Sequence, residues 1–309
     1  MKILHWMKKE TSGLAYSTLE LAKFEERAGH QVGIRQPSEH MPIYGRVNGD
    51  CDIHSVHSQL NLDAYTDRKP KFMWMHGEPL SSVGNGVSMK AIIDLAPRID
   101  ALICMRREEW PIWSSIKKTY LVQKGIDLER FHKIPEIVEK LSGEPAVLYA
   151  EHWRGSRNPL YLCIAMEKVH QKLPNARLHL YNCTDKRMIE CFDALIKNNK
   201  WWTFIRSLQG PQEDVNLLYN KVDILVSGLF PLYARGIEAF GAGKAFIGPG
   251  YNEYEDYPWK CTLDPDSIAD AIIRCWEGYD KIDYRQWAET HHNVEETVKQ
   301  SVAIYNRYL

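Results

Sequence analysis

The stretch DILVSGLFPLYARGIEAFGAGKAFIGPG, Asp223 to Gly250, contains a complete strand–helix–strand unit. DILVS and AFIGPG carry short apolar runs, and each run predicts a buried strand. Between them, IEAFGAG has the small and apolar side chains of a closely packed helix. A crossover of helix length joins parallel strands, so this stretch predicts a parallel α/β sheet.

The same alternation fills the second half of the chain. Its predicted strands are PAVLYA, ARLHLYN, WTFIRSL, DILVS and AFIGPG, and its predicted helices are NPLYLCIAMEKVHQKL, MIECFDALIKNN, EDVNLLYNK and IEAFGAG. IPEIVEKLSGEP, which precedes this half, has the proline, glycine and charges of a linker. The second half is therefore expected to be an open α/β domain of its own.

The first half repeats this organisation. Its predicted strands are KILHW, QVGIRQP, DIHSVHS, KFMWMH, ALICM and TYLVQK. LAYSTLELAKFEERAG predicts a helix that ends at Gly29. One stripe of this helix faces inward, formed by Leu14, Thr18, Leu21, Ala22 and Glu25. Both halves are thus predicted to be parallel sheets covered on both faces by helices.

Composition sets the class of protein. The 309 residues are 44% hydrophobic and 26% charged, which is typical of globular domains. The net charge of -1 shows no overall excess of positive charge of the kind that binds nucleic acid. No apolar run is long enough to span a bilayer, and MKILHW lacks the features of a signal peptide, so a cytoplasmic location is expected. The seven cysteines contain no C-x-x-C pair, which argues against disulfides and zinc.

Loops that follow strands should carry the chemistry, because open parallel sheets bind ligands at the carboxyl ends of their strands. Ser12 and Gly13 follow the first strand and open a helix, where free N–H groups either bind an anion or form an ordinary cap. His76 ends the strand KFMWMH and precedes Glu78, which predicts either a histidine in the cleft or a core histidine bonded to the backbone.

The loop EHWRGSRNP follows the first strand of the second half. His152, Arg154 and Arg157 lie in this glycine–serine turn ahead of a helix, an arrangement that suits a diphosphate. Solvated surface arginines are the alternative interpretation. Trp153 and Tyr233 are well placed to stack on a sugar.

Glu238 is the single acid in a helix that follows a cleft strand. With the helix expected to begin near Gly236, Glu238 would lie in its first turn, where the helix dipole stabilises a carboxylate. The same carboxylate suits a pair of vicinal hydroxyls such as those of a ribose. Compensation of the dipole alone is the other interpretation.

Taken together, these segments resemble a family, the GT-B retaining glycosyltransferases of the family 4 type. The resemblance rests on HGEP, LVQKGIDLERF, EHWRGSRNP, LPNARLHLYN, GPQEDVNLLYNKVDILVS and IEAFGAGKAFIG, which occur in the expected order over nearly the whole chain. It implies two Rossmann-like open parallel-sheet domains facing across a cleft. Residues 1–135 would be the acceptor-side domain, residues 136–288 the nucleotide-sugar domain, and residues 289–309 a helix that crosses back to the first domain.

The resemblance also implies roles for particular residues. Glu238 corresponds to the glutamate that binds the ribose, and His76 to a histidine close to the transferred sugar. The residues implied to bind the nucleotide sugar are Ser12, Gly13, His152, Arg154, Arg157, Arg235, Gly236, Ile237 and Glu238, of which Arg154, Arg157 and Glu238 join His76 as the catalytic set. Lys124-Gly125-Ile126-Asp127 corresponds to the family's Asn-Gly-hydrophobic-Asp turn.

Two positions depart from the family pattern. Phe230 stands where the family often has a second glutamate, and PLYAR replaces the glycines that usually follow it. The departures alter the sugar-contacting end of the donor site and bring Arg235 near the phosphates. They also motivate an alternative, a non-catalytic nucleotide-sugar-binding protein on a decayed transferase scaffold.

The expected function is a hexosyl or pentosyl transfer from a UDP- or GDP-linked sugar to a hydroxyl. Retention of configuration, no metal and no cofactor follow from the resemblance, with the departing phosphate taking the acceptor's proton; an inverting reaction would need a base such as Glu78. The acceptor is open among saccharide, lipid, metabolite, protein and modified nucleic-acid base. An NAD-dependent Rossmann oxidoreductase is a further alternative, which the absent G-x-G-x-x-G disfavours.

Three motifs that suggest metal binding have simpler interpretations. Asp50–Asp52 precedes a strand and is expected to form a turn, while Asp264–Asp266 is expected to cap a helix. His291–His292 precedes a helix and lacks the H-x-x-x-H spacing of a metal site.

Overall fold

The protein folds into two compact units. The computed structural model describes residues 1–7, 13–36, 39–45, 47, 50–57, 67–76, 89–107, 109–135, 139–150, 160–181, 190, 194, 205–208, 215–227, 233–248 and 257–309. Unit 1 comprises Met1–Asp127 and His292–Leu309, and unit 2 comprises Leu128–His291. The division falls after Asp127, whereas the sequence suggested a boundary after residue 135.

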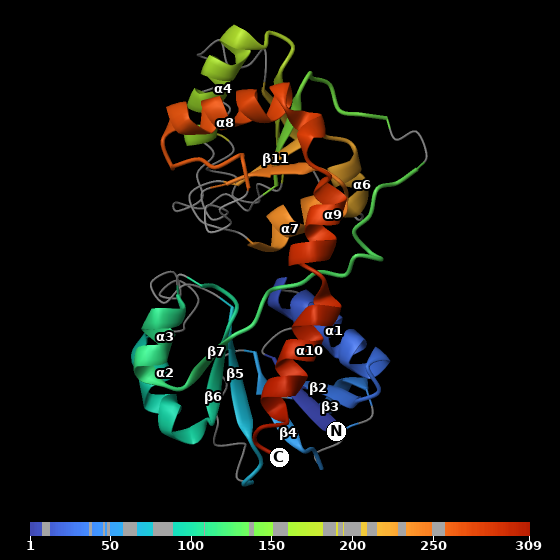
Figure 1. The fold of residues 1–309 in the computed structure, drawn as a ribbon, viewed down its shortest axis with the longest axis vertical. Coiled ribbons are helices and arrows are strands. Elements are labelled where there is room, and N and C mark those ends of the chain that lie inside the picture. Colours follow the sequence, from blue (N-terminus) through green and yellow to red (C-terminus); the bar gives the residue numbers. More distant parts are fainter. Residues whose placement is uncertain are drawn as a thin grey trace. The chain divides into compact units, whose positions relative to one another are not determined.

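Unit 1 contains a seven-stranded sheet in the order β3-β2-β1-β4-β5-β6-β7 (Figure 1). Its strands are β1 (Lys2–Trp6), β2 (Gln31–Gln36), β3 (Glu39–Gly45), β4 (Ile53–Val56), β5 (Lys71–Met75), β6 (Ala101–Cys104) and β7 (Thr119–Leu121). All neighbours are parallel except β2 and β3, which form an antiparallel pair at one edge. The sequence order reverses between β1 and β4, which is the topological switch point of the sheet.

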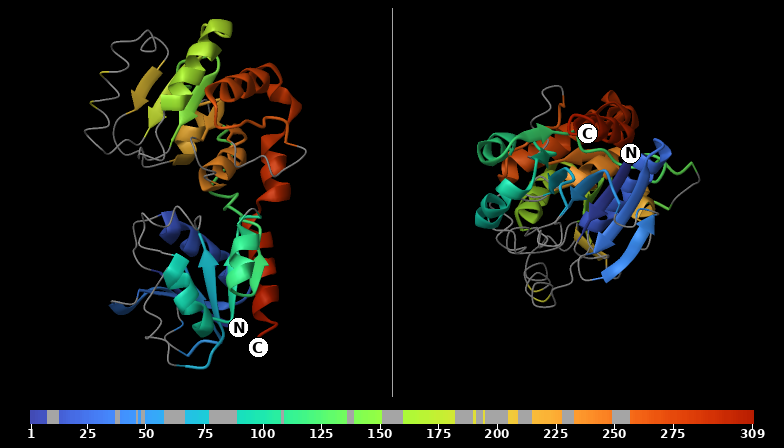
Figure 2. Two further views of the ribbon diagram at one scale, coloured as in Figure 1. Left: turned by 90° about the vertical axis from the view of Figure 1, so that its left-hand side faces the viewer. Right: turned by 90° about the horizontal axis from the view of Figure 1, so that it is seen from below.

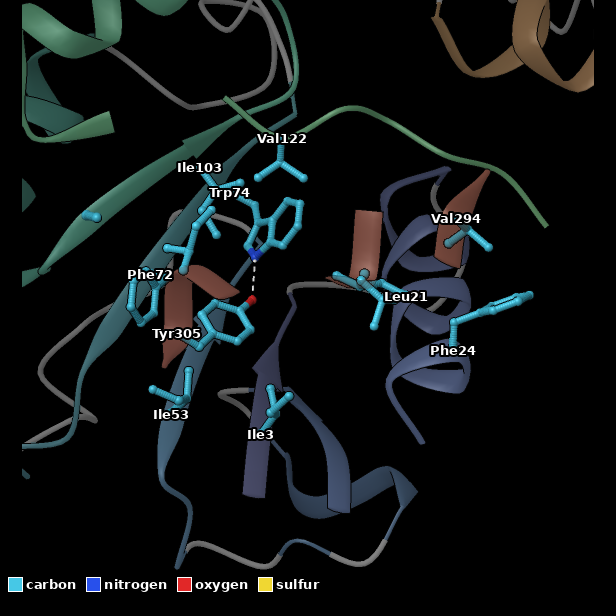
Figure 3. Packing of buried hydrophobic residues seen from close by; sticks show 13 residues of the cluster. Ile3, Leu21, Phe24, Ile53, Phe72, Trp74, Ile103, Val122, Val294 and Tyr305 are labelled. Carbon is cyan, nitrogen blue, oxygen red and sulfur yellow. Dashed lines mark hydrogen bonds between the residues drawn. The ribbon is translucent and has the colours of Figure 1, made fainter. Parts of the chain in front are cut away.

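Helices cover both faces of this sheet. Helix α1 (Gly13–Arg27) and helix α10 (Val294–Tyr305) pack on one face, in a cluster with Ile3, Ile53 and Phe72. Figure 3 shows this cluster, in which the Nε1 of Trp74 donates to the hydroxyl of Tyr305 at 3.3 Å. The other face is covered by α2 (Met89–Leu95), the 3-10 helix η3 (Ala96–Arg98) and α3 (Trp110–Ile116), which contribute Ile92 and Trp113 to a second cluster.

Helix α10 belongs to unit 1 although it lies at the far end of the sequence. Met1 and Tyr308 pack against the same cluster, so both ends of the chain lie in this unit (Figure 2). A short bridge between Ile126 and Asn293 fixes the start of the helix. Gly125 permits this contact, because a Cβ there would lie 2.3 Å from the Cα of Val294. The predicted return of the last helix to the first domain is confirmed.

Unit 2 contains a five-stranded parallel sheet in the order β10-β9-β8-β11-β12. Its strands are β8 (Ala146–Tyr149), β9 (Arg177–Tyr181), β10 (Ile205–Leu208), β11 (Ile224–Val226) and β12 (Ala245–Ile247). Its described helices are α4 (Leu160–Lys172), α6 (Val215–Asn220), α7 (Tyr233–Gly241), α8 (Pro265–Glu277), the 3-10 helix η6 (Tyr279–Lys281) and α9 (Tyr284–His291). Helix α4 packs against α8, and α7 packs against α9 and β12.

The predicted fold class, two open and largely parallel α/β sheets, is therefore confirmed. Two details were wrong. Strand β3 was not predicted, and helix α7 begins at Tyr233 instead of near Gly236 as predicted. Glu238 therefore lies beyond the first turn of α7, where the helix dipole contributes less to its stability than was expected.

One minor prediction is confirmed: Asp264 caps α8 by accepting a hydrogen bond from the Ser267 amide. The turn expected at Asp50–Asp52 is not observed; Asp52 instead accepts a hydrogen bond from the Lys2 amide at the start of β1. The five described cysteines are all free and buried. Within the described ranges, no helix combines the length and the apolar character needed to cross a membrane.

Candidate functional site

A small pocket lies at the carboxyl end of the unit 1 sheet. Its volume is about 30 Å³, which is enough to hold a water molecule. The described residues that line it are Ser17, Glu20, Leu21, His57, Trp74, His76, Met105, Lys124, Gly125, Val294 and Thr297. Side chains from α1, from the ends of β4 to β7 and from α10 thus meet at the edge where a parallel sheet is expected to bind ligands.

His76 follows β5 directly and lines this pocket, as the sequence predicted. Burial, followed by the nearby charge of Lys124, lowers the pKa of His76 to about 3. The imidazole is therefore neutral near pH 7, so one ring nitrogen carries a proton and the other can accept one.

Three histidines and a glutamate form a hydrogen-bonded chain that starts at His76. The Nε2 of His76 lies 2.9 Å from Nδ1 of His57, and the Nε2 of His57 lies 2.8 Å from Nδ1 of His5. The Nε2 of His5 lies 2.6 Å from Oε2 of Glu25 on helix α1. His5, His57 and Glu25 are buried, so His76 connects the pocket to a carboxylate inside the core.

Sequence reasoning identified His76 but missed its two histidine partners. KILHW and DIHSVHS were correctly assigned to strands, and Glu25 was correctly placed on the inward stripe of α1. Alternation along β1 puts His5 on the same face as Ile3, which was a usable signal. The sequence did not reveal the order of the strands in the sheet. Only the order β1-β4-β5 makes His5, His57 and His76 neighbours.

In unit 2, Glu238 has a buried tyrosine as its partner. The hydroxyl of Tyr219, on α6, donates to Oε2 of Glu238 at 2.7 Å. Arg235, one helical turn before Glu238, reaches the same hydroxyl with Nη1 at 3.5 Å. Burial, followed by the charge of Glu238, raises the pKa of Tyr219 well above its usual value and keeps the phenol neutral. The structure thus brings Arg235 and Glu238 together around one fixed hydroxyl.

The two residues between Arg235 and Glu238, Gly236 and Ile237, are packed inside unit 2. A Cβ on Gly236 would lie 2.6 Å from the ring of Phe246, so only glycine allows β12 to approach α7 this closely. The side chain of Ile237 is fully buried, so a ligand contact at this position would involve its backbone.

Other predicted site residues lie outside the described part of the chain. These are Ser12, Glu78, His152, Trp153, Arg154, Arg157 and Phe230. Gly13 is described and is the first residue of α1. His76, Lys124 and Gly125 line the unit 1 pocket, while Arg235, Gly236, Ile237 and Glu238 belong to helix α7 of unit 2. Among the described residues, no group of three histidine, cysteine or acidic side chains is arranged to hold a metal ion.

Comparison with solved structures identifies glycosyltransferases of the same architecture. HepE of Anabaena, in complex with UDP and glucose, superposes with a TM-score of 0.73 at 15% identity over 100% of both chains. A glycosyltransferase of Rickettsia africae gives a TM-score of 0.74 at 15% identity, over 99% of this chain and 98% of that one.

AviGT4, from avilamycin A biosynthesis, gives a TM-score of 0.72 at 13% identity, over 100% of this chain and 98% of that one. No family model matches the chain, and a search of curated proteins finds no match. The likeness is thus one of fold: like these glycosyltransferases, the chain folds into two Rossmann-like domains.

Proposed function

We propose that the protein is a glycosyltransferase that moves a sugar from a nucleoside-diphosphate sugar to a hydroxyl acceptor. The observation that carries this proposal is the likeness in fold to HepE over the full length of both chains, because the HepE structures hold UDP, UDP with glucose, or UDP-glucose. UDP is accordingly the nucleotide to test first and GDP the second.

Glu238 is the residue that we assign to the ribose. Its carboxylate is already oriented by the buried hydroxyl of Tyr219, and oriented acceptors bind a vicinal diol with less loss of side-chain freedom. Arg235 adds a positive charge beside it, which suits the diphosphate. His152, Arg154, Arg157 and the N-terminal segment at Ser12 and Gly13 complete the proposed donor site on the basis of the family resemblance.

His76 is the residue that we assign to the transferred sugar. It is neutral near pH 7, and it lines a water-sized pocket together with the charged side chains of Glu20 and Lys124. We further propose that the configuration of the sugar is retained and that no metal takes part. Guanidinium groups would then stabilise the charge that develops on the diphosphate.

A ligand screen followed by product analysis tests the proposal. UDP or GDP should raise the melting temperature of the protein, and the matching sugar nucleotide with an acceptor panel should give a product of higher mass. Addition of EDTA should leave turnover unchanged. Stabilisation by a nucleoside diphosphate without any transfer or hydrolysis would instead favour the binding protein suggested by Phe230. Stabilisation by NADH alone would contradict the proposal.

A further inference from the structure

We propose that Glu25, His5, His57 and His76 form a proton relay, in which a proton that enters or leaves at Nδ1 of His76 is balanced by a change of charge at Glu25. His76 is the group that faces the ligand. The other three are positioning residues that act through it.

The geometry supports a continuous relay. The three links measure 2.6 Å, 2.8 Å and 2.9 Å between the heavy atoms, all within hydrogen-bonding range. His5 and Glu25 are completely buried and His57 is 2% exposed, so bulk water does not compete for these links. Each imidazole uses both nitrogens, except that Nδ1 of His76 has no hydrogen-bond partner among the residues that the structure describes.

The sheet itself aligns the three rings. In the parallel register His5 is opposite Ser55 and Ser55 is opposite Phe72, so His57 and His76 each lie further along the next strand. They stay on one face because side chains alternate with a period of two. His57 also stacks on Trp74, with ring centroids 5.4 Å apart and planes at 16°. The middle ring of the relay is therefore held in place by its neighbours.

With neutral rings, the four groups have two complete hydrogen-bonding patterns among themselves. In the first, every ring donates from Nε2 toward Glu25, which accepts as a carboxylate and leaves Nδ1 of His76 free to take a proton. In the second, Glu25 is a carboxylic acid, every ring donates from Nδ1, and His76 presents an N–H to the pocket. Oγ of Ser55, 3.1 Å from Nε2 of His57, can accept from that ring in the first pattern and donate to it in the second. The patterns differ by one proton, and no ring becomes a cation in either.

The surroundings of Glu25 favour this exchange. Its Oε1 is buried and has no hydrogen-bond partner in the part of the chain that the structure describes, so the anion is incompletely solvated. The nearest other titratable group on α10 is Tyr305, whose pKa is raised by burial and then by the charge of Glu25, so it stays neutral. Among the described residues, Glu20 from α1 and Lys124 after β7 are the charged groups that line the pocket with His76. His30 is a further titratable group that interacts with the charge of Glu25.

Burial also disfavours the alternative in which the rings become imidazolium ions. Desolvation, followed by the His5 and His76 rings, lowers the pKa of His57 well below its usual value. A proton taken up at the pocket therefore costs less free energy when its charge is neutralised at Glu25 than when it stays on His57.

Within the proposed function, on which this step rests, the relay accepts the proton of the acceptor hydroxyl. The acceptor oxygen forms a bond to the anomeric carbon, and the bond from that carbon to the diphosphate breaks with its electron pair on the diphosphate. The hydroxyl proton moves to Nδ1 of His76 and the Nε2 proton of His76 moves to His57. The same shift repeats through His5, and Glu25 ends as a carboxylic acid. The relay therefore takes the place of the leaving phosphate, which the family resemblance implied as the proton acceptor.

The relay can be tested on the full-length protein without any sugar. Nitrogen-15 spectra of labelled histidines distinguish protonated from unprotonated ring nitrogens. We expect His5, His57 and His76 to carry their protons on Nε2 near neutral pH. On acidification all three should switch together to Nδ1 in one titration step. Rings that titrate one by one to imidazolium, or an absence of any joint switch between about pH 9 and about pH 4, would refute the relay.

Two variants and one control define the role of the carboxylate. Glu25→Gln keeps the shape and one hydrogen bond to His5 but removes the charge, so the joint switch should disappear. His57→Phe keeps the stack on Trp74 and interrupts the chain, so His76 should lose its preference for Nε2–H. Glu26→Gln on the exposed side of α1 changes the same charge and should leave the switch as in the wild type. Retention of the switch in Glu25→Gln would overturn the proposal.

Measurements of activity test the relay independently of the spectra. Glu25→Gln should lower kcat by about 10² and leave the KM for the donor within about threefold, the pattern expected when general base catalysis is lost. An unchanged kcat and pH profile would refute the catalytic use of the relay. If the spectra show the joint switch but no transfer occurs with any donor, the relay stands and the proposed function fails. Transfer without the switch gives the opposite conclusion.

Discussion

Single hydrogen bonds decide how the two best-defined candidate residues work. Glu238 accepts from the hydroxyl of Tyr219, and His76 bonds to His57. Neither candidate is held by the backbone alone, so the structure supplies each with a partner that can be removed without touching the candidate itself. This separates orientation of the side chain from its chemistry.

The hydroxyl of Tyr219 should matter for donor binding. In Tyr219→Phe, Glu238 loses a buried donor, so its carboxylate is less well oriented for a ribose. We expect the Kd for the nucleoside diphosphate to rise about fivefold, which corresponds to about 1 kcal/mol. Calorimetric titration measures this. Tyr279→Phe is the matched control, because that hydroxyl donates to the backbone of Asp223 in the same unit. Equal Kd values for wild type and Tyr219→Phe would contradict the prediction.

Glu238 and His76 should have separable effects. Glu238→Ala should raise the donor Kd by about 10–100-fold, as expected for a lost hydrogen bond to a charged group. His76→Ala should lower kcat by a similar factor and leave the donor Kd within about threefold. His132→Ala, at an exposed histidine of unit 2, serves as control. Unchanged kinetics in both site variants would contradict the assignment of both residues.

At the scale of elements, the sequence predicted most strands and helices because their apolar runs are bounded by clear turn signals. The strand β3 was missed for two reasons. EHMPIYG contains Pro42, which is unusual within a strand, and β3 pairs antiparallel with β2 without the helix-length connection used to predict the other strands. The start of α7 was misplaced because PLYAR has no capping signature. Within the site, Glu25 was placed inward by helical spacing, but its link to His76 depends on strand order, which local patterns do not encode.

The attachment of α10 should depend on Gly125. A Cβ at this position would lie 2.3–2.6 Å from backbone atoms of Asn293 and Val294, and backbone cannot rotate away as a side chain can. We expect Gly125→Ala to destabilise unit 1 by about 3 kcal/mol. Gly236→Ala, which meets only the ring of Phe246, should be partly rescued by Phe246→Leu, whereas no side-chain change near Gly125 should restore stability. Urea unfolding measures these free energies, and a neutral Gly125→Ala would disprove the argument.

At the scale of the whole molecule, several histidines of unit 1 have lowered pKa values in the folded state. Burial lowers the pKa of His54, His57 and His76, so these rings stay neutral in the folded state at pH values where the unfolded chain protonates them. The unfolded state then binds more protons, and the free energy of unfolding must fall as pH decreases below about 6.5.

Each such histidine contributes a slope of at most about 1.4 kcal/mol per pH unit, and the slope should be smaller in His57→Phe. Urea unfolding at several pH values, followed by the amide signals of β4 and β5, measures it. Stability that rises or stays constant between about pH 7 and about pH 5 would contradict the prediction.

The return of residues 292–309 to unit 1 has a consequence for the nascent chain. All of unit 2 is synthesised between β7 and α10, so the ribosome completes one lobe while the other still lacks a helix. Until Val298, Ile304 and Tyr305 emerge from the ribosome, the apolar surface around Ile3, Phe72 and Trp74 is exposed to water. Until the last helix leaves the exit tunnel, this apolar surface of unit 1 is therefore exposed to aggregation and to chaperones.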